Sequence, residues 1–313
     1  MTGPVARGRA ATATTARTVA QAKINLFLRV LAREASGYHQ IETLFCRIDL
    51  GDDVRVRTRV RGRSLDATGD AMPAAGLGAV HRNLAWRAAE AFSNAAGWPN
   101  DWAIEIEKRI PVGGGLGGGS ADAGAVLRCL NALAPSPLQR HALLGLAASV
   151  GADVPFLTLD EPLALAWGRG DRLVPLPALP RHDVALACFP FGVSTPDAFT
   201  WLDDAHADVA AGASAVELGQ LVDWAHVARL AHNDFEAVVA PHFPAIAATL
   251  AAWRSRATQL GDAGAFALLT GSGSTVFLTA EHVPSDIASL PDASVRVVQT
   301  ATATRVVDVE LSD

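Results

Sequence analysis

The sequence predicts a two-domain protein of the α+β class. At 313 residues the chain is long for a single hydrophobic core, so two packed domains are expected. Segments with strand-like alternation and segments with helical periodicity follow one another in both halves of the chain. A proline-rich stretch, PLPALPR at residues 175–181, separates the halves. We therefore predict a flexible tail over residues 1–18, a first domain over residues 19–178 and a second domain over residues 179–313.

The predicted tail, MTGPVARGRAATATTART, is rich in Ala, Thr and Arg and contains no acidic residue. An organellar transit peptide can have this composition, and so can a floppy basic tail, which is the reading we prefer. No secretory apolar segment follows, so export is not expected. Three scattered cysteines, Cys46, Cys129 and Cys188, fit a reducing compartment better than a disulfide framework. We expect a cytoplasmic protein, with an organelle as the second choice.

The first domain is expected to begin with strands. Apolar side chains alternate along residues 21–30 with a second set that contains Lys23 and Asn25. This period of two predicts a half-buried strand that places Lys23 and Asn25 side by side on its open face. Downstream we predict a strand over residues 41–50, a turn at 51–53, a strand over 54–60 and a surface excursion over 62–79.

Helices and strands then alternate to the end of the chain. In the first half we predict a helix over residues 83–96, a strand over 102–110, a glycine-dense loop over 111–120, and helices over 121–133 and 138–150. In the second half we predict a strand over 184–189, helices to about residue 259, strands over 265–269 and 275–279 around a turn at 270–273, and finally a short helix with two strands.

Charge and hydropathy exclude two classes of partner. The formal charge of −6 leaves no general basic surface, which argues against a nucleic acid held by its phosphates. No apolar run reaches the roughly 20 residues that a membrane helix needs, so no membrane partner is expected. A phosphorylated small ligand remains compatible, because it needs only one local positive site. Only two of the 26 basic residues, Lys23 and Lys108, are lysines, and both lie beside the motifs described next.

The loop PVGGGLGGGSADAG at residues 111–124 has six glycines in seven positions and joins a strand to a helix. Such a backbone can approach a ligand closely, and the helix N-terminus that follows at Ser120 favours an anion. We interpret it as a polyphosphate cradle; the alternative is a glycine-rich turn without a ligand. The loop lacks a Walker A lysine. Its G-x-G-x-x-G spacing lacks the acid that a dinucleotide site needs roughly 20 residues further on.

This loop resembles the central motif of the GHMP kinases, in the form shared by the diphosphocytidyl-methylerythritol kinases. Five further motifs match in family order: A-K-I-N-L at residues 22–26, G-Y-H at 37–39, G-A-D-V-P at 151–155, N-D-F-E at 233–236 and T-G-S-G at 270–273. The sequence departs from the usual motif at Ala121, where serine is common, and at Gly124, where alanine is common. The resemblance implies the two-domain GHMP kinase fold, with an N-terminal domain like ribosomal protein S5 domain 2 and a ferredoxin-like C-terminal domain.

The resemblance implies ATP-dependent phosphorylation of the 2-hydroxyl of diphosphocytidyl-methylerythritol, in isoprenoid biosynthesis. It makes Asp153 the catalytic base and Lys23 the cation that orients it. Taken alone, Asp153 could instead cap a helix or turn, and Lys23 could be a solvated strand residue. The implied ATP-binding residues are Pro111, Gly113, Gly114, Gly115, Leu116, Gly117, Gly118, Gly119 and Ser120 of the loop, with Asn83 and Lys108 near the ATP base. Mg²⁺ would be held mainly by ATP phosphates, without a protein metal site, and Ser120 is a candidate ligand.

The family resemblance also implies a substrate site. Tyr38, the single tyrosine of the chain, would stack on cytosine, His39 would hydrogen-bond the base edge, and Phe199 would supply the opposite aromatic ring. Phe199 could instead be a buried helix residue and His39 a turn cap. The remaining implied substrate residues are Asn25, Thr195, Gly271 and Ser272.

Two other functions stay open at this stage. The chain could be a sibling GHMP kinase acting on homoserine, mevalonate or a sugar, although the G-Y-H motif and the loop around Asp153 argue against this. It could also be a non-catalytic GHMP-fold sensor, although the presence of both Lys23 and Asp153 argues against that. In each case the partners are ATP and a small molecule, and the oligomeric state is not predicted.

Overall fold

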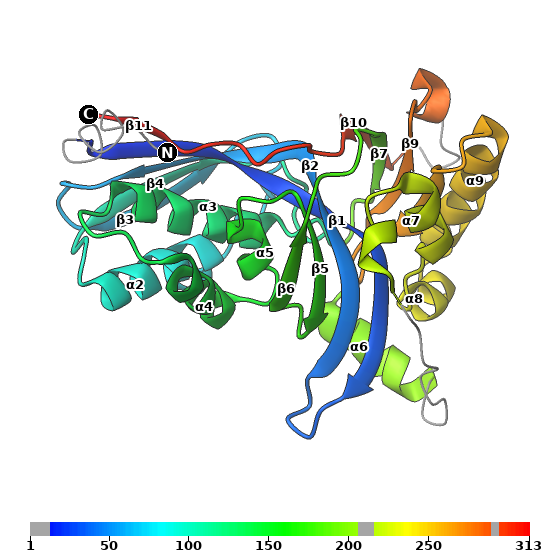
Figure 1. Cartoon of the computed structure of the whole chain (residues 1–313), viewed down its shortest axis with the longest axis horizontal. Helices are drawn as coiled ribbons and strands as arrows, with labels where there is room; N and C mark the ends of the chain where they lie inside the picture. The colour runs from blue at the N-terminus through cyan, green and yellow to red at the C-terminus, as the bar shows by residue number, and fades with distance from the viewer. Residues whose placement is uncertain (1–12, 206–215, 289–293) are drawn as a thin grey trace.

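The computed structural model describes residues 13–205, 216–288 and 294–313, which build two sheets with helices (Figure 1). The larger sheet has the order β11-β1-β2-β4-β3, with β5 pairing to β2 and β6 to β5. Its strands are β1 (Thr15–Arg33), β2 (His39–Arg57), β3 (Arg63–Thr68), β4 (Trp102–Glu107), β5 (Leu163–Gly168), β6 (Arg172–Leu176) and β11 (Glu310–Ser312). One face of this sheet is covered by α2 (Leu84–Ala96), α3 (Gly118–Leu133), α4 (Arg140–Val150) and α5 (Val154–Thr158).

The smaller sheet has the order β10-β7-β9-β8, and all its pairings are antiparallel. Its strands are β7 (Asp183–Cys188), β8 (Phe266–Leu269), β9 (Val276–Ala280) and β10 (Arg296–Ala301). The helices of this half are α6 (Thr195–Ala205), α7 (Trp224–Leu230), α8 (Glu236–His242) and α9 (Pro244–Leu260), with 3-10 turns η2 (Leu218–Gln220) and η3 (Ser285–Ala288); a further 3-10 turn, η1 (Val80–Arg82), precedes α2 in the first half. The α+β class is confirmed, and the predicted boundary near residue 178 falls in the connection from β6 to β7.

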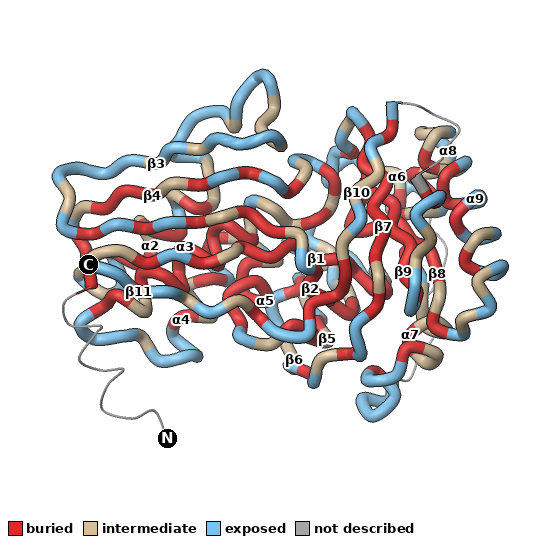
Figure 2. The backbone as a smooth tube through the Cα atoms, turned by 90° about the horizontal axis from the view of Figure 1, so that it is seen from above, coloured by how far each residue is buried: buried red, intermediate tan, exposed pale blue. Residues whose placement is uncertain are grey.

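The predicted half-buried strand at residues 21–30 is wrong in two respects. The strand is longer, beginning at Thr15 inside the predicted tail, while residues 1–12 lie outside the described part of the chain. Both of its faces are buried from Ala20 to Leu28 (Figure 2). Helices α3 and α5 pack against the strand, and residues of the second half, such as Thr270 and Gly271, contact Asn25. Irregularities in the β1–β2 register interrupt the strict alternation. Lys23 and Asn25 do lie side by side, but inside the protein.

The predicted turn at residues 51–53 is also wrong, since β2 runs through it unbroken. Gly51 is required by a close approach of β1: a Cβ there would lie 2.5 Å from Val19 Cγ1. Asp52 is fully buried and accepts hydrogen bonds from the backbone N–H groups of Arg109, at 2.5 Å, and Ile110, at 2.8 Å. Gly51 and Asp52, which predicted a turn, therefore allow close strand packing and form buried hydrogen bonds.

Two smaller corrections concern residues 62–79 and the last strand. The surface excursion contains β3, which pairs in parallel with β4. The final strand, β11, was expected in the second half but pairs with β1 of the larger sheet. The chain thus returns to the first sheet after building the second. The helix after the glycine loop begins at Gly118, three residues earlier than predicted.

Candidate active site

The family-motif segments meet at two adjoining clefts between the sheets. The larger cleft, of about 820 Å³, is lined by Lys23, Asn25, Tyr38, His39, Ser120, Asp153, Thr195, Phe199, Gly271 and Ser272, among others. The smaller, of about 500 Å³, is lined by the glycine loop together with Asn83 and Lys108. Gly115, Gly117 and Ser120 line both clefts, so the loop forms their shared wall. All the predicted site residues therefore line one or the other cleft.

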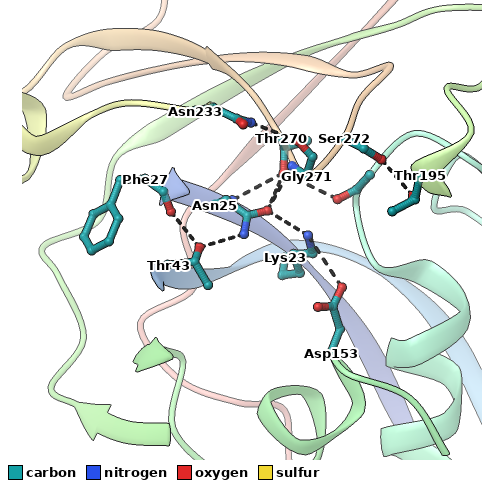
Figure 3. Close-up of polar contacts among 11 residues, drawn as sticks. Lys23, Asn25, Phe27, Thr43, Asp153, Thr195, Asn233, Thr270, Gly271 and Ser272 are labelled. Atoms are coloured by element: carbon teal, nitrogen blue, oxygen red, sulfur yellow. Dashed lines mark hydrogen bonds and ion pairs between the residues drawn. The ribbon is translucent and has the colours of Figure 1, made fainter. Parts of the chain in front are cut away.

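Lys23 and Asp153 form an ion pair that lines the larger cleft (Figure 3). The Lys23 Nζ lies 3.6 Å from Asp153 Oδ2 and donates a 2.7 Å hydrogen bond to Asn25 Oδ1. Lys23 is 3% exposed, which excludes the solvated strand lysine. The Asp153 side chain is about 29% exposed and makes no capping hydrogen bond to α5, which excludes the helix cap. The carboxylate thus faces the cleft with a cation beside it.

Asn25 is held in a single orientation by four hydrogen bonds besides that of its backbone. Its Oδ1 accepts from Lys23, from the Gly271 N–H at 3.0 Å and from the Thr270 hydroxyl at 3.3 Å. Its Nδ2 donates to Thr43 Oγ1 at 2.8 Å, and Thr43 in turn donates to the Phe27 carbonyl (Figure 3). Thr43 was missed by the sequence analysis, because nothing in the sequence of β2 indicates which β1 side chain it faces.

The glycine loop packs directly on the turn at residues 270–275. A Cβ on Gly115, whose φ is +79°, would lie 2.2 Å from the Thr270 carbonyl oxygen. The Thr275 N–H donates to the Gly114 carbonyl at 3.2 Å, and the Lys23 N–H donates to the Leu116 carbonyl at 3.0 Å. Two motifs about 155 residues apart in the sequence are thus joined through their backbones.

Beyond the loop, α3 presents the free N–H groups expected of an anion site. Its N-cap is Gly117, which has no side chain, and its first turn contains no acidic residue. The first hydrogen bond of the helix runs from the Ala121 N–H to the Gly117 carbonyl. The N–H groups of Gly118, Gly119 and Ser120 are therefore not used within the helix. With the helix dipole, they favour a phosphate at the wall between the clefts.

Lys108 is buried beneath the loop, between two carboxylates. Its Nζ forms ion pairs with Asp52 and, at 2.7 Å, with Asp122 of α3. Burial by itself would lower the pKa of Lys108, but the attraction of Asp122 and Asp52 more than offsets this and raises it. Burial raises the pKa of Asp122 to about 7, Lys108 opposing the rise and Asp52 adding to it. The ammonium thus serves an internal network, and its predicted place near the ATP base rests only on its lining the smaller cleft.

Asn83 also has a structural role. Its side-chain oxygen accepts from the Ala85 N–H at 2.9 Å and so caps α2. It lines the smaller cleft together with the loop, and contact with ATP stays a prediction.

Tyr38, His39 and Phe199 lie together at the aromatic end of the larger cleft, and their contact with cytosine stays a prediction. Tyr38 is 59% exposed, and the Arg169 guanidinium lies 4.0 Å from its ring centroid. The Phe199 ring, half-buried on α6, stacks on His39 at 4.3 Å and 10°. The His39 Nε2 lies 2.6 Å from Asp203 Oδ1. The ring against which Phe199 stacks is therefore that of His39.

Thr195 and Ser272 close the same end of the cleft. Their hydroxyl oxygens lie 2.8 Å apart, which ties the start of α6 to the turn after β8 (Figure 3). Asn233 holds that turn from behind, donating to the carbonyls of Leu269 at 2.7 Å and Gly271 at 2.9 Å. The N-D-F-E motif was recognised in the sequence, but its role in bracing the turn could not be read from spacing.

Arg169 and Asp203 are cleft-side residues that sequence reasoning missed. Arg169 also pairs with Glu34, at 2.6 Å. Asp203 contacts Arg33 as well as His39 and so links α6 to the end of β1. Neither residue belongs to a motif, and only the tertiary fold brings them to Tyr38 and His39.

No group of three His, Cys, Asp or Glu side chains within the described ranges is arranged to hold a metal ion. Over the same ranges, no helix is both long and apolar enough to span a bilayer.

Comparison with known proteins agrees with this geometry. Residues 83–161 match the family model of the GHMP kinases N terminal domain. A 4-diphosphocytidyl-2-C-methyl-D-erythritol kinase of Anaeromyxobacter dehalogenans is 41% identical over 267 residues, covering 83% of this chain and 79% of the relative. The corresponding kinase of Leifsonia xyli is 36% identical over 302 residues, covering 90% and 94%.

Solved structures give the same result. A crystal structure of 4-(cytidine 5'-diphospho)-2C-methyl-D-erythritol kinase superposes with a TM-score of 0.70 and 33% identity, covering 91% of this chain and 98% of that one. Homoserine kinase from Cytophaga hutchinsonii superposes with a TM-score of 0.66 at 16% identity, a likeness of fold alone.

Proposed function

This chain belongs to the family of 4-diphosphocytidyl-2-C-methyl-D-erythritol kinases, and we propose that Asp153 and Lys23 carry its phosphoryl transfer. The enzyme is an ATP-dependent phosphotransferase that phosphorylates the 2-hydroxyl of its substrate, an alcohol, in the non-mevalonate route to isoprenoids. One observation carries the proposal for the residues. The Lys23–Asp153 pair lines the aromatic-lined cleft, and Lys23 lies against Gly117 of the glycine loop, which also lines the second cleft.

In the proposed reaction, ATP occupies the smaller cleft with its phosphates against the glycine loop and the start of α3. The diphosphocytidyl substrate occupies the larger cleft, with its cytosine at Tyr38, His39 and Phe199. The substrate hydroxyl then lies at the shared wall, between Asp153 and the γ-phosphate. Asn25, Thr195, Gly271 and Ser272 line the same cleft and would contact the substrate there.

Asp153 accepts the proton of the 2-hydroxyl as the oxygen forms its bond to the γ-phosphorus. The bond from that phosphorus to the bridging oxygen of ADP breaks, and ADP leaves. Lys23 places a positive charge beside the Asp153 carboxylate, where the reacting hydroxyl and the polyphosphate meet. Since Lys23 is held by Asn25, it can serve both the carboxylate and the reacting oxygen without rearrangement.

Mg²⁺ would enter with ATP and neutralise charge on its phosphates. The loop offers the Ser120 hydroxyl, while the nearby Asp122 carboxylate is paired with Lys108, so the phosphates and water would supply most of the ligands of the ion. We also propose a cytoplasmic enzyme, since Cys46, Cys129 and Cys188 are all unpaired and buried.

The test measures ADP release from MgATP and the diphosphocytidyl substrate by wild type, Asp153→Asn and Asp101→Asn. Asp101 precedes β4 and lines neither cleft, so its variant is the matched control. We expect Asp153→Asn to lose at least about 100-fold in kcat while still binding substrate. Asp101→Asn should keep full activity.

Three other outcomes of this test would contradict the proposal. Turnover with homoserine or mevalonate but not with the diphosphocytidyl substrate would place the chain among sibling kinases. Binding of both ligands without ADP release would make it a sensor. Full activity in Asp153→Asn would remove Asp153 as the base.

A further inference from the structure

The position of Asp153 depends on α5, a helix of only five residues that follows it directly. So short a helix is not stable by itself, because forming the first turn costs more than its few hydrogen bonds return. The Asp153 side chain does not cap it. The contacts that hold α5 in place therefore decide where the Asp153 carboxylate lies relative to Lys23.

The first of these contacts is the Arg47 guanidinium. Arg47 lies on β2, as the register partner of Lys23 on β1, and is 1% exposed. Its Nη2 donates to the carbonyls of Phe156 and Leu159, both at 3.0 Å, at the C-terminal end of α5. The guanidinium also lies over the Phe156 ring, 5.3 Å from its centroid.

Arg47 occupies an unfavourable environment for a charge. Among the described residues no carboxylate lies within ion-pairing distance of it, and its Nε is buried without a hydrogen-bond partner. Burial, with the nearby Arg128 adding to the effect and Asp160 and Glu161 opposing it, lowers the pKa of Arg47 to about 9. A buried cation without an ionic partner costs stability. A functional benefit would explain why a charged residue is buried here. The hydrogen bonds of Arg47 to the end of α5 indicate that this benefit is the positioning of that helix.

The second contact is the close packing of α5 on α3 at Gly124. A Cβ at this position would lie 2.4 Å from the Leu157 carbonyl oxygen and 2.6 Å from the Leu157 carbonyl carbon. These are backbone atoms of α5, so they cannot turn aside as a flexible side chain would. Alanine is common at this position in the family, so the missing side chain at Gly124 sets how near α5 lies to α3 in this chain in particular.

A third set of contacts runs from α5 to Lys23. The Phe156 ring stacks on Phe45 at 5.0 Å, and the Lys23 Nζ lies 5.5 Å from the Phe45 ring centroid. These contacts fix α5 against β1 and β2, the two strands that carry Lys23 and Phe45. A shift of α5 would change the Lys23–Asp153 separation of 3.6 Å.

We propose that Arg47 and Gly124 are positioning residues, which clamp α5 between β2 and α3 and so place the Asp153 carboxylate against Lys23. The proposal rests on the proposed role of Asp153 as the base. Neither residue lines either cleft, so both act through α5 rather than on the substrate.

Gly124→Ala tests the packing contact, with Gly145→Ala as its matched control. Both glycines lie inside helices, but a Cβ at Gly145 on α4 would meet no atom within 4 Å. Misplacement of a catalytic group by about 1 Å can cost on the order of 100-fold in rate. We expect Gly124→Ala to lower kcat about 10- to 100-fold, with KM for ATP and for the diphosphocytidyl substrate changed less than about twofold. Gly145→Ala should retain the wild-type kcat.

Arg47→Met and Arg47→Lys test the hydrogen-bonding contact. The methionine fills the space without donors, whereas the lysine keeps a donor for the α5 carbonyls. We expect kcat to fall about 10- to 100-fold in Arg47→Met and to recover at least partly in Arg47→Lys. Thermal unfolding of each variant shows whether it is folded at the assay temperature.

The same substitutions in an Asp153→Asn background separate positioning from general damage. If they act by placing Asp153, each should change the residual rate of that background less than about twofold, because the base is already lost. Equal losses in both backgrounds, or an unchanged kcat in Gly124→Ala and Arg47→Met, would overturn the inference. Full activity of Asp153→Asn alone would instead refute the proposed base.

Discussion

Lys23 and Lys108 are the two lysines of the chain, and each is buried against carboxylates. Both positions are tight. Gly117 and Gly271 would each bring a Cβ within 3.5 Å of the Lys23 side chain, and Gly118 would bring one within 3.6 Å of the Lys108 Nζ. A planar guanidinium is wider than an ammonium and needs more room. Limited space, as well as charge, therefore explains why these two positions carry lysine and not arginine.

Tyr38 should contribute through its ring rather than its hydroxyl. An exposed ring with Arg169 on one face suits stacking of a base, which is worth roughly 1–3 kcal/mol. We predict that Tyr38→Leu raises KM for the diphosphocytidyl substrate about 10-fold or more, while KM for ATP stays unchanged. Tyr38→Phe should behave like wild type. Steady-state kinetics with each substrate varied in turn would check this, and equal losses in both variants would point to the hydroxyl instead.

Asp122 should make stability depend on pH. Burial raises the pKa of Asp122 to about 7, whereas an unfolded aspartate has a pKa of about 3.9. The folded state thus holds its proton more tightly, and the free energy of unfolding falls as pH rises from about 4 to about 7. Asp122→Asn cannot titrate. We predict that wild type loses stability relative to Asp122→Asn, on the order of 2 kcal/mol between pH 5 and pH 8.

Urea unfolding of both proteins at several pH values measures this difference. Parallel stability curves for wild type and Asp122→Asn would show that Asp122 keeps one protonation state throughout, held by Lys108.

At the scale of elements, the glycine loop and the turn at residues 270–275 form one unit. The contact of Gly115 with the Thr270 carbonyl leaves no room for a side chain, and its φ of +79° favours glycine independently. We predict that Gly115→Ala lowers kcat/KM for ATP roughly 10- to 100-fold, because the loop must move away from the turn.

Gly62→Ala is the control for Gly115→Ala. Gly62 also has a positive φ, +77°, but a Cβ there would meet nothing within 4 Å. Both variants should lose about 1–2 kcal/mol of stability from the left-handed conformation. Only Gly115→Ala should lose activity. If Gly62→Ala were equally impaired in kcat/KM, backbone strain rather than loop displacement would explain the result.

The unbroken strand β2 connects the two ends of the site. Its 19 residues carry contacts at both ends of the site: His39 at one end, Thr43 and Arg47 in the middle, and Asp52 toward the other. A break at residues 51–53, as expected from the sequence, would separate Asp52 from Lys108. One long strand therefore aligns the aromatic end of the cleft with the base of the glycine loop.

At the scale of the whole molecule, the C-terminal segment closes the larger sheet. Buried polar groups of Thr18, Gln21 and Arg128 find their partners on the backbone of residues 305–308. The segment crosses from the smaller sheet to β1, beside the first residues of that strand. It thus satisfies buried polar groups that lie 179 residues (Arg128) to 290 residues (Thr18) earlier in the sequence.

Removal of residues 304–313 should therefore be costly. It leaves several buried donors and acceptors unpaired, each worth about 1–3 kcal/mol, so we predict a loss of at least a few kcal/mol in the free energy of unfolding. Removal of residues 311–313 alone keeps the partners of Thr18, Gln21 and Arg128, and should cost much less. Urea unfolding of both truncated proteins and of wild type measures the difference. Similar losses of stability in the two truncations would show that the pairing of β11, and not these polar contacts, dominates.

The sequence by itself determined the features that depend on neighbouring residues. The glycine loop, the helix after Asn83 and most strands were predictable, because turns, caps and periodicity are local properties. The six ordered motifs also identified the family and named the residues that line the clefts. These are chemical signatures written in consecutive positions, and they need no knowledge of the fold.

Only the tertiary structure decided which residues meet. Lys108 reaches Asp52 and Asp122, Arg47 reaches the end of α5, and the last strand returns to β1. Gly51 and Asp52 read as a turn because their local preferences favour one, yet packing against β1 and an ion pair to Lys108 hold them in a strand. Long-range contacts outweigh weak local preference in the core, since burial and paired charge carry more free energy there than turn propensity does.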